Sequence, residues 1–96
     1  MIYGVLQIDL RLQGIRSLKD KRSVVQKLMT KIRNAYSISV SEVGDHDMMG
    51  NAVIGVATAG SNAIQIENVL QQVLKIVDEN PEVQVTDSVI LVDQLK

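Results

Sequence analysis

Apolar and polar residues alternate along the first twelve residues of the chain. Apolar side chains occupy every even position from Ile2 to Leu12 except position 4, which is a glycine, whereas the odd positions are polar or mixed. A period of two predicts a strand with one buried and one mixed face. Gly14 then interrupts the pattern, so we expect this strand over residues 2–12.

The spacing of apolar residues becomes helical after Ser17. Ser17, with Asp20 three residues later, is typical of an N-cap followed by an acidic first turn. The apolar residues that follow fall on one side of a helix: Val24, Val25, Leu28, Met29, Ile32 and Ala35. This pattern predicts an amphipathic helix over residues 18–35.

Two further strands joined by a hairpin are predicted next. Residues 37–44, SISVSEVG, alternate again, and residues 51–59, NAVIGVATA, are apolar at both parities, as in a central strand. The six residues between them, DHDMMG, have the composition of a hairpin loop that closes at Gly50.

The chain ends with a second helix and a fourth strand. We expect Ser61 to cap this helix, whose apolar stripe runs from Ile64 to Val77 and which ends near Asn80–Pro81. Residues 82–95, EVQVTDSVILVDQL, predict the last strand.

The element order β-α-β-β-α-β predicts one α+β domain over residues 1–96. Right-handed crossovers place both helices on the same face of an antiparallel four-stranded sheet in the order 4-1-3-2, which is the ferredoxin-like, split βαβ arrangement. The third and fourth strands are apolar at both parities, so part of the uncovered face is expected to pack against something. We expect a homodimer through this open sheet face.

Composition excludes several kinds of site. The 96 residues include no cysteine, so disulfides and thiolate chemistry are excluded. The N-terminus lacks the features of a signal peptide, and no apolar run is long enough for a membrane span, so a cytoplasmic protein is expected. Phe and Trp are absent and there are two Tyr, which leaves little for base stacking on a sheet.

Positive charge is concentrated near the N-terminus although the net charge is -1. Eight of the ten Lys and Arg residues precede residue 37, and six of them lie between Ser17 and Tyr36, where Asp20 is the one acid. Ordinary exposed helices mix both signs of charge at i,i+4 spacing, and this segment does not.

The same segment resembles the leading signature of the YlxP-like bacterial proteins, known as domain of unknown function 503. The resemblance rests on Leu18, Lys19, Lys21 and Arg22, and on the strand residues Ser39, Val40, Glu42 and Val43. It spans nearly the whole chain and implies a ferredoxin-like fold. It also implies genes beside translation and ribosome-maturation genes, no assigned activity, and often a Trp in the hairpin loop, where this chain has Met48.

The basic helix suggests contact with an anionic partner, namely RNA or a ribosomal particle, through phosphates and shape. Lys21 falls within the apolar arc of the helix, and we expect it to cross toward Gly14–Arg16 and join a cation cluster at the helix start. Two alternatives stay open: Lys21 extends to solvent, and the whole basic face is merely solvated. The candidate residues are Arg16, Lys19, Lys21, Arg22, Lys27, Lys31 and Arg33.

The sequence contains no convincing motif for a catalytic site or a metal site. The run around Gln13 and Gly14 has a superficial likeness to an acylphosphatase phosphate loop, but the expected Arg position holds Leu18. The adjacent Asp45, His46 and Asp47 of the hairpin cannot all converge on one metal ion. We therefore expect a non-enzymatic protein without cofactor or metal. The alternative function is a regulatory module that senses a metabolite at a dimer interface near the Gly14 loop.

Overall fold

Six elements follow one another in the order that the hydrophobic pattern predicts. In the computed structural model, which describes residues 1–96, they are β1 (Ile2–Leu12), α1 (Leu18–Ala35), β2 (Ser39–Gly44), β3 (Asn51–Gly60), α2 (Ala63–Asp78) and β4 (Val83–Gln94). The prediction of a ferredoxin-like α+β fold is confirmed.

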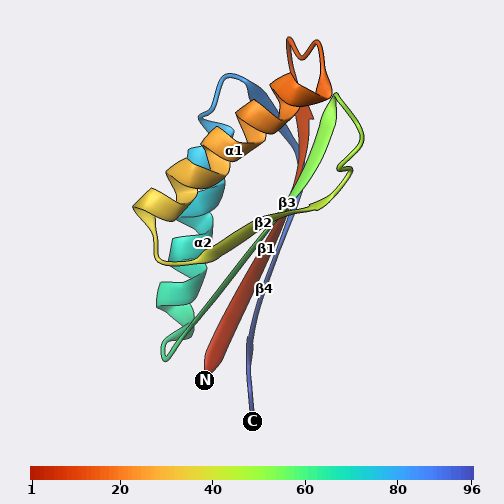
Figure 1. Cartoon of the computed structure of the whole chain (residues 1–96). Coiled ribbons are helices and arrows are strands. Elements are labelled where there is room, and N and C mark those ends of the chain that lie inside the picture. The colour runs from red at the N-terminus through yellow and green to blue at the C-terminus, as the bar shows by residue number, and fades with distance from the viewer.

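The sheet has the order β2-β3-β1-β4, which is the predicted order read from the other edge. All three strand pairs are antiparallel, and β1 lies in the interior between β3 and β4. Figure 1 shows both helices on one side of the sheet, while the other side carries no element of the chain. The surfaces open to solvent are therefore the outer side of the helices and the uncovered face of the sheet.

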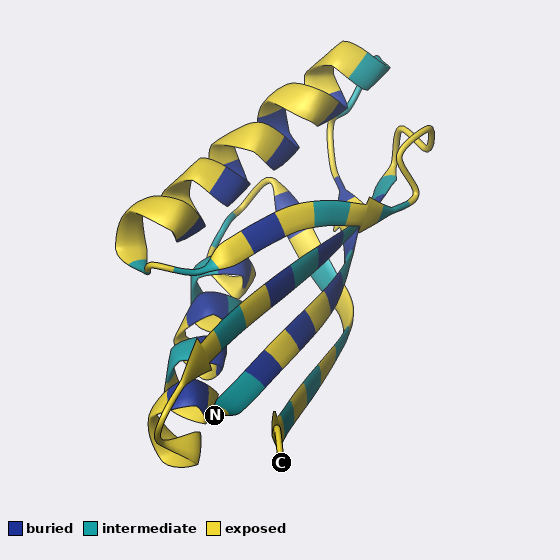
Figure 2. Cartoon of the chain, turned by 60° about the horizontal axis from the view of Figure 1, so that its bottom comes forward, coloured by how far each residue is buried: buried dark blue, intermediate teal, exposed yellow.

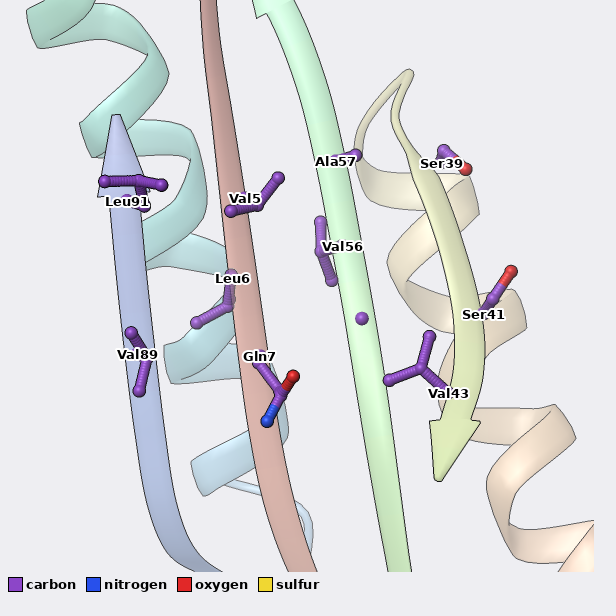
Figure 3. Close-up of a pocket in the computed structure, with 11 residues that line it drawn as sticks. Val5, Leu6, Gln7, Ser39, Ser41, Val43, Val56, Ala57, Val89 and Leu91 are labelled. Atoms are coloured by element: carbon purple, nitrogen blue, oxygen red, sulfur yellow. The ribbon is translucent and has the colours of Figure 1, made fainter. Parts of the chain in front are cut away.

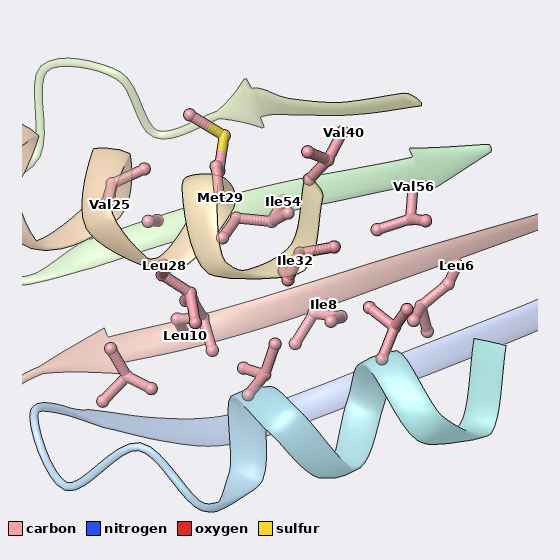
Figure 4. Close-up of a cluster of buried hydrophobic side chains, with 14 of the residues drawn as sticks. Leu6, Ile8, Leu10, Val25, Leu28, Met29, Ile32, Val40, Ile54 and Val56 are labelled. Atoms are coloured by element: carbon pink, nitrogen blue, oxygen red, sulfur yellow. The ribbon is translucent and has the colours of Figure 1, made fainter. Parts of the chain in front are cut away.

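The core lies between the sheet and the two helices. Even-numbered residues of β1 and β3 point into it, including Leu6, Ile8 and Ile54, each with at most 1% of its surface exposed. Figure 4 shows Ile8 and Ile54 beside Ile32 of α1, with Leu6 farther along the same cluster. The alternation of buried and exposed residues along the strands, visible in Figure 2, is the period of two read from the sequence.

The start of α1 follows the prediction, and two other boundaries do not. Ser17 Oγ accepts the backbone N–H of Asp20 at 3.1 Å, so Ser17 is the N-cap. The expected cap of α2 at Ser61 is wrong by one residue, because Asn62 Oδ1 accepts the backbone N–H of Gln65 at 3.1 Å. Strand β2 begins at Ser39 rather than at residue 37, because the N–H of Ile38 bonds to the carbonyl of Tyr36 in a tight turn.

Helix α2 lies directly against β1 at Gly4, the glycine that interrupts the apolar series. A Cβ atom at this position would lie 2.5 Å from Ile66 Cγ2 and 2.8 Å from Leu70 Cδ1, both on α2. These distances are too short for carbon atoms in contact. The missing side chain of Gly4 therefore sets how closely α2 approaches the sheet.

Replacing this glycine by alanine should weaken the packing of α2. We expect Gly4→Ala to lower the free energy of unfolding by about 1–3 kcal/mol through overpacking, as measured by urea denaturation. Gly50→Ala is the matched control, because no atom lies within 4 Å of a Cβ at that position. Equal stability of the two variants would contradict the close approach of α2.

Candidate nucleic-acid interface

Six cations form an exposed basic surface on α1 and the turn before it. We call the following residues the basic surface: Arg16, Lys19, Arg22, Lys27, Lys31 and Arg33. At 1.5 Å per residue, the 18 residues of α1 extend this surface over roughly 27 Å. At about 100° per residue, Arg22 and Arg33 lie along one edge of the exposed face, whereas Lys27 and Lys31 lie along the other.

Uncharged polar side chains occupy the middle of the same helix face. The four residues recur at three- and four-residue intervals, and all are exposed: Ser23, Gln26, Thr30 and Asn34. Each can donate and accept hydrogen bonds. The exposed face of α1 thus combines a central row, which is neutral after Lys19 in the first turn, with cations on both sides.

No acid neutralises the basic surface. The structure holds one salt bridge within 4.0 Å, and it joins Lys21 to Glu42, neither of which belongs to this surface. The carboxylate of Asp20 is occupied at the helix start, where Oδ2 accepts the backbone N–H of Arg16 at 3.2 Å. The acids of α2 form no ion pair with α1. The six cations therefore present their charge to solvent.

Arg33 has a second contact that the other five cations lack. Its Nη2 donates to the backbone carbonyl of Val40 at 2.9 Å, which ties the end of α1 to β2. Because β2 is an edge strand, this bond occupies one of its backbone groups. A guanidinium has five N–H donors, so most of those of Arg33 stay free.

Lys21 does not belong to the exposed basic surface. Its side chain is only 1% exposed, and Nζ lies 3.2 Å from Glu42 Oε2, which is itself 17% exposed. The expected crossing toward Gly14–Arg16 is wrong, and so is the alternative of extension to solvent. The opposite charge of Glu42 on β2 and two loop carbonyls hold this ammonium group inside the protein. Of the four cations expected to gather at the helix start, Arg16, Lys19 and Arg22 remain exposed.

Three oxygen atoms surround the ammonium group of Lys21. Besides the carboxylate of Glu42, Nζ donates to the backbone carbonyl of Asp45 and, at 3.3 Å, to that of His46. Glu42 Oε2 makes no well-aligned hydrogen bond, so its attraction to Nζ is mainly ionic. Two hydrogen bonds and one ion pair thus offset the burial of this ammonium group.

The hairpin loop is shaped by these contacts. Asp45 adopts a left-handed backbone conformation with φ of 58°, which Asp tolerates better than most residues. The ring of His46 lies over β2, with Nε2 3.0 Å from the carbonyl oxygen of Glu42. No three His, Cys, Asp or Glu side chains come together as metal ligands anywhere in the chain. The backbone carbonyls of Asp45 and His46, which accept from Lys21, hold the loop against α1.

Sequence reasoning missed Glu42, although a signal for it was present. Val40 is buried beneath α1, and Glu42, two residues later, points to the same face of β2. Lys21 likewise lies within the apolar arc of α1. Two opposite charges at core-facing positions of consecutive elements are the pattern of a buried ion pair.

A shallow groove marks the open face of the sheet. It has a volume of about 560 Å³ and is lined mainly by apolar residues of all four strands, among them Val5, Val43, Val89 and Leu91 (Figure 3). Gly55 forms part of its floor, where a Cβ would lie 2.9 Å from Val43 Cγ1. The groove lies on the opposite side of the sheet from the basic surface.

Comparison with known proteins places the chain in a family. A family model described as a protein of unknown function (DUF503) matches residues 3–90. The "Uncharacterized protein YlxP" of Bacillus subtilis (strain 168) is 37% identical over 83 residues, which cover 86% of this chain and 90% of that protein. A structure described as a dimeric ferredoxin-like protein of unknown function from Thermobifida fusca YX matches with a TM-score of 0.43 and 15% identity, covering 97% of this chain and 92% of that one. No helix of this chain is long and apolar enough to cross a membrane.

Removing the buried ammonium group should cost far more than removing an exposed one. We expect Lys21→Met to lower the free energy of unfolding by about 3 kcal/mol, because the Glu42 carboxylate loses its partner. Lys27→Met, the same change on the exposed face of α1, should shift it by no more than about 0.5 kcal/mol. Urea denaturation measures both.

A double variant separates charge from packing. Adding Glu42→Gln to Lys21→Met removes the unpaired carboxylate and should restore part of the lost stability. If Lys21→Met were as stable as Lys27→Met, the ammonium group would not be held in the interior.

Proposed function

The chain belongs to the DUF503 family of proteins of unknown function, and we propose that it is a non-enzymatic protein that binds RNA, alone or within a ribosomal particle, through the basic surface of α1. The observation that carries this proposal is the absence of any ion pair among the six exposed cations of that surface.

Unpaired cations on one helix face favour a polyanion. Each cation that approaches a phosphate releases condensed counterions, and this release supplies much of the affinity of nucleic-acid binding. A cation already paired with an acid would first have to lose that partner. Since none of the six is paired, each can approach a phosphate without breaking an internal ion pair.

The neutral row of α1 adds hydrogen bonding to this charge. Ser, Thr, Asn and Gln side chains commonly bind phosphate and sugar oxygens in nucleic-acid complexes. Here they lie between the two cationic edges, where the backbone of a bound strand would pass. The ribose 2′-OH, which both donates and accepts hydrogen bonds, could be recognised by the amides of Gln26 and Asn34.

The open sheet face is unsuited to RNA. RNA-recognition motifs of similar topology stack bases on aromatic side chains of the sheet, and Tyr3 is the one aromatic residue in any of the four strands here. Asp9 and Asp87 lie opposite each other on this face and would repel phosphates. Binding is therefore proposed for the helical side alone.

Charge reversal on α1 tests the proposal. Lys19→Glu with Lys27→Glu should weaken binding to a fluorescein-labelled RNA hairpin, measured by anisotropy over a series of salt concentrations. The slope of log K against log salt should fall in magnitude by roughly 0.7 to 0.9 for each phosphate that the variant no longer binds.

The matched control reverses two lysines outside the basic surface. Lys75→Glu with Lys96→Glu makes the same change in net charge, and both positions are exposed. This control should lose affinity only slightly. Equal losses in the two double variants would mean that overall charge, and not α1, governs binding, and the proposal would be rejected.

A further inference from the structure

Four large apolar side chains stand exposed together on the open face of the sheet. Val5 is 40% exposed, Val43 52%, Val89 58% and Leu91 53%. The strand register sets Val5 opposite Leu91 on one side and Ala57 on the other, so that apolar residues of neighbouring strands are contiguous. Figure 3 shows these side chains projecting from the outer face around the groove. A contiguous apolar area of this kind is typical of a surface that another protein covers.

The edges of the sheet are poorly suited to pairing with another strand. On β2, Arg33 occupies the carbonyl of Val40, and the strand is irregular between Glu42 and Gly44. On β4, the N–H of Ser88 donates to the side chain of Asp87 at 2.9 Å, and the N–H of Gln94 donates to Asp93 at 2.7 Å. Side chains that bind edge groups and bulges that distort the edge both discourage strand addition. Association is thus directed to the open face.

We propose that a second copy of this chain covers the open face, forming a back-to-back dimer in which the two basic surfaces point outward in opposite directions. Such a dimer has four layers, with two sheets inside and the helices outside. In a two-fold dimer the same surface of both copies is in contact, so the apolar side chains around the groove would pack against those of the partner copy.

The size of the contact predicts a reversible dimer. From strand spacing and rise, the apolar part of the face measures roughly 20 Å by 20 Å. Because side chains project from the flat sheet, two such faces would bury about 1,000 Å² of accessible surface in total. This is near the lower limit for a specific interface. We therefore expect monomer and dimer to exchange with protein concentration.

The acids on the open face restrict how the two sheets cross. Asp9 and Asp87 are direct neighbours in the register, and a crossing that stacked them on the same pair of the partner would gather four carboxylates. Near-orthogonal packing, centred on the groove, leaves these acids at the rim. Arg11, farther along β1 and free of any ion pair, lies at the same end of the sheet and is available to them.

The back-to-back dimer would carry two basic surfaces. What it does with them rests on the proposed RNA binding, whereas the dimer itself does not. Stacked sheets lie about 10 Å apart and a helix is about 10 Å wide, so the two basic surfaces would be separated by roughly 30–40 Å. They face away from each other, so a short RNA cannot reach both. The dimer would instead bridge two RNA segments.

The first experiment tests the dimer without RNA. Sedimentation equilibrium should show the mass rising with concentration from 10.6 kDa toward twice that value. Val89→Asp with Leu91→Asp should abolish the rise. Ile64→Asp with Met48→Asp is the matched control, because both of these exposed apolar residues lie off the sheet face, and it should dimerise normally. A wild-type protein that stays monomeric, or a dimer indifferent to Val89 and Leu91, would overturn the inference.

The second experiment tests bridging. Donor- and acceptor-labelled RNA hairpins are mixed with protein at concentrations that favour the dimer, and energy transfer between them is expected. The Val89→Asp, Leu91→Asp variant should bind each hairpin yet produce no transfer. Transfer that survives in this monomeric variant would overturn bridging, as would its absence in a wild-type dimer that binds both hairpins. If the protein dimerises but binds no RNA, the proposed function is refuted and the dimer interface is not. If native mass spectrometry finds a monomer that carries a small apolar molecule, the dimer interface is refuted.

Discussion

The ammonium group of Lys21 is the constraint that fixes how α1, β2 and the hairpin lie together. A cation that is 1% exposed must meet acceptors on every side, and here they come from the side chain of Glu42 and from two carbonyls of the loop. Pairing mainly offsets the desolvation of both charges. The pair therefore adds little net stability, but it fixes the position of α1. The helix cannot slide or rotate relative to the hairpin without leaving a charge unpaired in the interior. The orientation of the exposed face of α1 is thereby set.

The one-sided arrangement of the helices separates two kinds of surface. Helix α1 turns its apolar stripe and Lys21 toward the sheet, which leaves its remaining cations outside. On the far side of the sheet, the odd-numbered residues of β1 meet apolar and acidic neighbours of β3 and β4. A sheet covered on both faces would have no such second surface. The basic surface and the exposed apolar area therefore lie on opposite sides of the same thin molecule, where binding at one need not obstruct the other.

Periodicity was sufficient to predict the fold, and tertiary contacts decided the site. The alternation from Ile2 to Leu12 and the helical spacing after Ser17 are local properties, which is why the element order and sheet order could be read from them. The angular position of Lys21 showed only that it points inward. Its partner is 21 residues away on another element, and nothing in the helix itself selects Glu42 over solvent or over the loop before α1. Likewise Ser61 and Asn62 are both good N-caps, and only the backbone geometry chose Asn62.

The cations of α1 are alike in sequence but differ in what they do in the structure. Lys21 is buried and paired with Glu42. Arg33 donates to the carbonyl of Val40 on the edge strand β2 and keeps most of its other donors free. A lysine at position 33 would have three donors on one atom and could not hold a strand carbonyl while presenting a planar face to a phosphate. The remaining cations make no internal ion pair and add nothing evident to the fold. Repulsion between Lys27 and Lys31, one turn apart, disfavours the helix slightly, and a polyanion that lies along α1 would remove that repulsion.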